Sequence, residues 1–130
     1  MTLEDKDKAV LEMFKHYSNV RFLMLPLFFT VMGAILVSYW TLSSSLSLDK
    51  SLQIWVALAG AVISLLFVIY EYHLREALIN VSALLPESMK ELRHTKQLGA
   101  VTSVTLLLYA GPIVFWLSRI WHDLGGNQLW

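Results

Sequence analysis

Three long segments of the sequence carry no charged side chain, and they constrain the fold more than any other feature. They are residues 22–41, 52–70 and 98–117. A helix needs about 20 apolar residues to cross the ~30 Å hydrocarbon core of a bilayer, where it satisfies its own backbone hydrogen bonds. Buried helices of a water-soluble bundle would instead show polar positions at helical spacing, which these segments lack. The sequence therefore predicts an all-α membrane protein with three transmembrane helices.

The composition supports this fold class and excludes several functions. Hydrophobic residues make up 56% of the chain and charged residues 15%, whereas about a quarter of the residues are charged in an ordinary soluble domain. Ten basic residues balance ten acidic ones, so no overall positive field exists to bind nucleic acid. The absence of cysteine excludes thiolate metal sites and cysteine nucleophiles. The partner expected first is the lipid bilayer.

The segment before the first span, residues 1–21, is predicted to form a cytoplasmic amphipathic helix. Thr2 and Asp5 have the spacing of a helix cap. Apolar side chains then recur at helical spacing, so one stripe of the helix can lie in the membrane interface or against a partner. The residues of this stripe are Val10, Met13, Phe14 and Tyr17.

The other connecting segments complete a single membrane domain over residues 1–130. Residues 71–97 are predicted to continue the second span as a cytoplasmic helical segment that is broken at Pro86. The loop between the first two spans is short and rich in serine, and residues 118–130 form an external tail.

The cations predict the orientation of the chain in a bacterial inner membrane. Eight of the ten Lys and Arg residues lie in 1–21 and 71–97, and such a bias marks cytoplasmic segments. The amino terminus is therefore expected inside the cell and the carboxyl terminus outside. Tryptophans gather toward the outer side, where indoles can lie at the level of the lipid headgroups. They are Trp40, Trp55, Trp116, Trp121 and Trp130.

Small residues in the first two spans indicate close helix packing. Spacings of four residues between small side chains let helix backbones approach each other in a membrane. This packing serves either the two arms of one hairpin or an interface between subunits, and a bulky residue at Gly60 is predicted to weaken assembly. The candidate packing residues are Gly33, Ala34 and Ser38 in the first span and Ala57, Gly60, Ala61 and Ser64 in the second.

Gly111 and Pro112 interrupt the third span. Proline removes one helical hydrogen bond, so a hinge or a static kink is expected there.

Ionisable side chains gather at the predicted inner boundary of the membrane. Glu91 and His94 have the E-x-x-H spacing of di-metal carboxylate sites, but a complete site needs a second such motif and further carboxylates. We therefore expect a solvated layer of ion pairs, with no catalytic residue, no metal and no cofactor. Glu71 lies closest to the hydrocarbon and most needs a partner such as Arg21. The cluster comprises His16, Arg21, Glu71, His73, Arg75, Glu76, Glu91 and His94.

Two resemblances accompany these patterns. The layout, with residues 95–100 (TKQLGA) opening the third span, resembles bacterial diacylglycerol kinase, a trimeric enzyme with an amino-terminal surface helix and three spans. Gln97 stands where that family has an acidic residue, and its E-x-x-N-x-x-x-E pattern is absent after Glu71, so kinase activity is not implied. Residues 16–22 (HYSNVRF) are similar to uncharacterised small bacterial three-span inner-membrane proteins.

Three functions remain open from the sequence. The first is a small non-catalytic membrane subunit that oligomerises or joins a larger membrane complex. The second is a homo-oligomeric pore gated by the cytoplasmic helices. The third is an enzyme that acts on a lipid headgroup at the inner boundary. The pore would be lined by Thr102, Ser103 and Thr105, or by Thr30 and Ser38.

Overall fold

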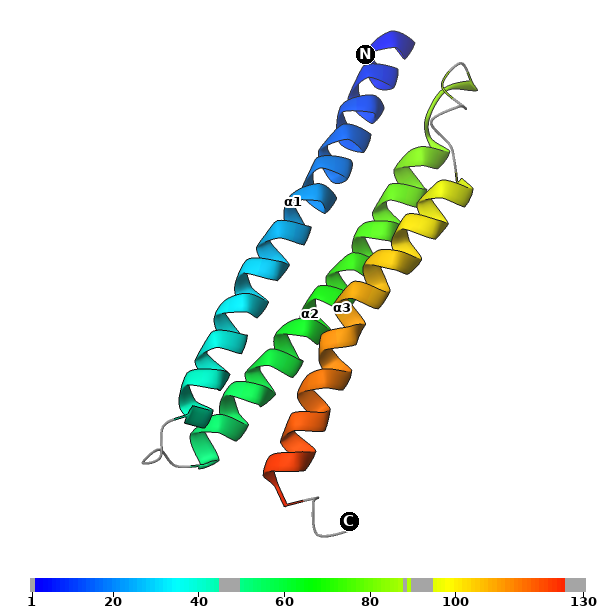
Figure 1. The fold of residues 1–130 in the computed structure, drawn as a ribbon. Helices are drawn as coiled ribbons and strands as arrows, with labels where there is room; N and C mark the ends of the chain where they lie inside the picture. The colour runs from blue at the N-terminus through cyan, green and yellow to red at the C-terminus, as the bar shows by residue number, and fades with distance from the viewer. Residues whose placement is uncertain (1, 45–49, 88, 90–94, 126–130) are drawn as a thin grey trace.

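A computed structural model describes residues 2–44, 50–87, 89 and 95–125 of the chain. Within these residues it forms three α-helices, which run alternately up and down (Figure 1). All three contain segments long and apolar enough to cross a membrane. The predicted all-α membrane fold is thus confirmed. The helices are α1 (Leu3–Ser44), α2 (Lys50–Ala83) and α3 (Thr95–Asp123).

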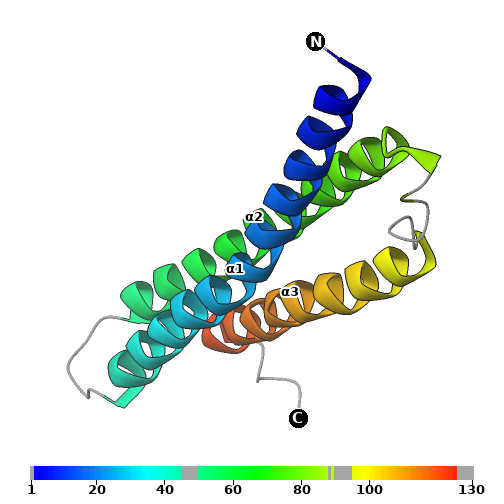
Figure 2. The ribbon, with the colours of Figure 1, turned by 90° about the horizontal axis from the view of Figure 1, so that it is seen from above.

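Helix α1 joins the predicted amphipathic segment and the first span without a break. At its start, the Asp5 amide donates to the Thr2 hydroxyl at 3.3 Å, and the Thr2 amide donates to the Asp5 carboxylate at 3.0 Å. This arrangement confirms the predicted cap. Residues 3–20 do not form a helix separate from the first span, and in Figures 1 and 2 this part of α1 extends away from the other two helices.

Helix α2 continues well past the second span, as predicted, and ends at Ala83, three residues before Pro86. Its buried positions include residues spaced seven apart, a repeat typical of helices that pack at a small crossing angle. Helix α2 packs against both α1 and α3. The seven-residue repeat runs through Ala57, Ser64, Glu71 and Leu78.

The core is rich in aromatic side chains, and Trp116 belongs to it. Only 2% of Trp116 is exposed, because its indole lies directly on Gly60, which has no side chain to displace it. A Cβ atom built on Gly60 would lie 2.5 Å from Cε2 of Trp116. Trp116 therefore packs inside the bundle and does not face lipid, and its level relative to the headgroups stays a prediction. Trp40, Trp55 and Trp121 are exposed, and Trp130 is outside the described residues.

Helix α3 is continuous through Gly111 and Pro112. The helix is therefore not broken there, and a hinge at this position stays a prediction. Helix α1 likewise contains Pro26 without a break.

Candidate functional site

A buried polar cluster of Arg21, Glu71 and Thr102 joins all three helices. The Arg21 guanidinium on α1 pairs with the Glu71 carboxylate on α2. Its Nη2 also donates to Oγ1 of Thr102 on α3 at 2.8 Å. Arg21 is 7% exposed and Glu71 1%. Burial of a charged pair away from water is costly unless the pair is well bonded, and ionisable groups buried among membrane helices are commonly functional.

The position of each charge on its helix explains its burial. Arg21 lies seven residues before the buried Phe28, and Glu71 lies seven residues after the buried Ser64. Both charges therefore occupy the inward faces of their helices. The structure confirms Arg21 as the partner that Glu71 needs.

Two buried polar atoms beside this pair have no hydrogen-bond partner in the described part of the chain. They are Nε of Arg21 and the hydroxyl of Tyr109 on α3. The Tyr109 ring packs against Phe28 of α1 and Phe67 of α2, with ring centroids 4.6 and 5.5 Å apart. Tyr109 also interacts electrostatically with both Glu71 and Arg21. The three helices thus enclose an ion pair together with unused hydrogen-bonding capacity.

The other predicted members of the inner-boundary cluster do not join this pair. His16, His73 and Glu76 are exposed and Arg75 is half-buried. Across the described residues, no three potential His, Asp or Glu ligands come together to hold a metal ion. Glu91 and His94 lie outside the described residues, so their predicted E-x-x-H arrangement stays untested.

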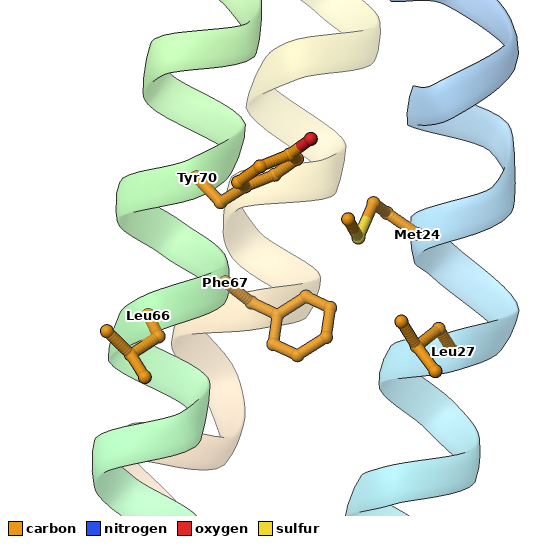
Figure 3. A pocket seen from close by; sticks show the side chains of 5 residues that line it. All are labelled: Met24, Leu27, Leu66, Phe67 and Tyr70. Atoms are coloured by element: carbon orange, nitrogen blue, oxygen red, sulfur yellow. The ribbon is translucent and has the colours of Figure 1, made fainter.

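An apolar recess of about 200 Å³ opens between α1 and α2 beside the polar cluster. In Figure 3, side chains from α1 face side chains from α2 across this recess. One wall begins one turn after Arg21 and the other ends directly before Glu71. The recess is lined by Met24, Leu27, Leu66, Phe67 and Tyr70.

The predicted packing residues divide between the inside and the outside of the bundle. In α2 they are all buried, and the Ser64 hydroxyl donates to the Gly60 carbonyl at 2.9 Å. In α1 they are all exposed, and a Cβ atom on Gly33 would meet nothing within 4 Å. The small residues of α2 therefore pack within one chain, whereas those of α1 are exposed, with Gly33 at the edge of a recess that Pro112 and Trp116 also line. The exposed ones are Gly33, Ala34 and Ser38.

These exposed residues belong to a longer strip on α1, which we call the α1 small-residue face. Its positions follow helical spacing, and every one is exposed. The hydroxyls of Thr30, Ser38 and Thr41 donate to backbone carbonyls of their own helix at 2.8–2.9 Å. The strip is therefore smooth and its hydroxyl donors are satisfied. It comprises Thr30, Gly33, Ala34, Val37, Ser38 and Thr41.

A second polar contact joins α1 to α3 near the other end of the bundle. The Tyr39 hydroxyl donates to the Asp123 carboxylate at 2.8 Å. Nearby, the Arg119 guanidinium lies 5.7 Å from the ring centroid of Trp40. Sequence patterns did not indicate these contacts, because they depend on the rotation of α3 about its axis.

Comparisons with protein-family models, with curated proteins and with solved structures found no match to this chain.

Proposed function

We propose that this protein is a non-catalytic integral membrane subunit, which associates through the α1 small-residue face with further copies of itself or with another membrane protein. One observation carries the proposal: all six residues of this face are exposed, although they have the spacing of a helix contact and five of them are small. Membrane helices bring small residues together because close backbone approach increases van der Waals contact.

The chemistry of the face indicates a helix as the occupant. Its hydroxyls are already bonded to the carbonyls of α1, so an apolar partner would leave none of these donors unsatisfied. Gly33 leaves open space above the α1 backbone. A transmembrane helix that presents its own small or flat apolar residues would fit this surface.

We further propose that the protein lies in a bacterial inner membrane with its amino terminus in the cytoplasm. The bias of cations toward 1–21 and 71–97 supports this orientation. The exposed indoles of Trp40, Trp55 and Trp121 support it as well, because they lie near the end of α1, the start of α2 and the end of α3, which meet at the opposite end of the bundle.

The geometry favours a subunit over a pore. Thr102 and Thr105 are buried, with Thr105 bonded to the Val101 carbonyl, whereas Ser103 is exposed. Thr30 and Ser38 direct their hydroxyls to their own helix. The candidate lining residues therefore do not present a shared row of free hydroxyls.

Photo-cross-linking in native membranes tests the proposed interface. A photoreactive amino acid at Ala34 should give an adduct of discrete mass, because this position would lie against the partner helix. The matched control is Val62, which is exposed in an apolar part of α2 and should give no such adduct. Equal adducts from both positions, or none from Ala34, would contradict the proposal.

A further inference from the structure

Helix α1 changes its surroundings at Arg21. None of the residues 3–20 is buried, and this part of α1 extends away from α2 and α3 (Figures 1 and 2). Residues 22–27 are also exposed or half-buried, and continuous burial of the inward face resumes only at Phe28. Arg21 is therefore the one buried residue of α1 ahead of Phe28.

Polar contacts hold α1 to the bundle at this level. Arg21 reaches Glu71 on α2 and Thr102 on α3, whereas the recess between Met24 and Tyr70 shows that α1 and α2 are not closely packed beside it. Loss of the Arg21 contacts would therefore leave α1 held here only by half-buried apolar side chains, such as Tyr17 and Leu25.

We propose that the Arg21–Glu71–Thr102 cluster is a proton-controlled contact: protonation of the Glu71 carboxylate releases Arg21 and lets residues 3–24 of α1 move away from α2 and α3. The proton comes from the aqueous phase, because Glu71 directly follows the charge-free segment 52–70. It converts the carboxylate to a neutral carboxyl group and removes the counter-ion of the guanidinium.

The released Arg21 drives the movement. An unpaired guanidinium is costly to bury, and movement of α1 would bring it to water or to lipid phosphate. The groups that face Glu71 are Arg21 and Thr102, with the phenol of Tyr109 close enough for electrostatic interaction. Of these, Glu71 is the group whose ordinary pKa lies in the acidic range. This proposal is independent of the proposed subunit interface, since it concerns movement within one chain.

Spin-label distances in liposomes test the proposal. The chain has no native cysteine, so Met13→Cys on α1 and Val104→Cys on α3 can be labelled alone, and both positions are exposed. We expect the distance between the labels to lengthen as pH falls through the range in which carboxylates titrate. A distance distribution that does not change with pH would overturn the proposal.

Two further substitutions in the spin-labelled protein identify the group that causes the change of distance with pH. Glu71→Gln should give the longer distance at every pH, because glutamine carries no charge for Arg21. Glu76→Gln removes an exposed carboxylate of the same helix and should follow the unmodified chain. A pH response that persists in Glu71→Gln would assign it to another group, such as His16 or His73, and overturn the proposal. Circular dichroism must show unchanged helicity at every pH. A loss of helix at low pH would mean that the longer distance comes from unfolding, and this would contradict the proposal.

Discussion

At Gly60, the absence of a side chain lets the Trp116 indole lie against the α2 backbone. We predict that Gly60→Ala lowers the free energy of unfolding by about 1–3 kcal/mol, because the added methyl group overpacks this contact. Thermal unfolding in detergent measures the effect. Gly33→Ala is the matched control and should cause no loss, since its Cβ would meet open space. Equal losses at both positions would contradict this packing.

The contact between Gly60 and Trp116 also changes the effect that we expect from a bulky residue at Gly60. From the sequence it is predicted to weaken assembly, but the structure shows that it would first separate α2 from α3 within one chain. Gly33 is the glycine that can report on assembly.

The buried ion pair predicts a large difference between two carboxylates of α2. Glu71→Gln breaks the buried pair by removing the counter-ion of Arg21, which should cost up to about 3–5 kcal/mol of stability. Glu76→Gln should cost about 0–1 kcal/mol, because Glu76 is exposed. Chemical unfolding in a defined detergent compares the two variants. Similar losses would show that Glu71 is not the counter-ion that the fold depends on.

At the scale of one helix, the cap of α1 predicts a dependence on pH. Hydrogen bonds from the Thr2 hydroxyl and amide hold the pKa of Asp5 below the usual aspartate value of 3.8. The pKa of Asp5 is thus lower in the folded chain than in the unfolded one. The cap therefore stabilises the first turn fully at pH values above the unfolded pKa. This contribution disappears as pH falls through the lowered pKa.

Backbone chemical shifts of the first turn measure this effect. We expect helical shifts for residues 3–6 at neutral pH and a loss of helicity in strong acid. Asp5→Ala should show the reduced helicity already at neutral pH. Identical shifts in the variant and the unmodified chain would show that the cap contributes nothing.

The sequence predicted the length and ends of the helices better than their inward faces. The charge-free segments indicate the spans, and Pro86 indicates the end of α2, because both signals act locally. Within a span almost every position is apolar, so no contrast between faces shows which side of the helix packs inward. The continuity of α1 was missed because an amphipathic segment and an apolar segment are both helical, and no residue between them ends the helix.

The candidate site was predictable only in part for the same reason. Arg21 and Glu71 stand out because they are charges next to hydrocarbon. Thr102 and Tyr109 give no such signal, since their roles depend on how α3 is turned toward the other helices. The exposure of Gly33 likewise follows from the placement of α1, whereas its spacing from other small residues does not distinguish inside from outside.

At the scale of the whole molecule, the proposed orientation predicts where each end of the chain lies. A reporter fused after residue 130 should be active outside the cytoplasm, and one fused near Asn80 should be active inside. The reason is that cations remain on the cytoplasmic side during insertion. Activities in the opposite compartments would reverse every assignment of sidedness.

The mass of the intact assembly in lipid nanodiscs tests the central claim most directly. We predict that the unmodified protein has a mass above that of one chain, through further copies or a co-purifying membrane protein. Gly33→Leu should reduce it to the mass of one chain without lowering thermal stability, because a Cβ atom on Gly33 meets nothing within 4 Å and the recess that Gly33 lines with Pro112 and Trp116 is open. A single-chain mass for the unmodified protein, or an unchanged assembly in Gly33→Leu, would contradict the claim that this face binds a partner helix.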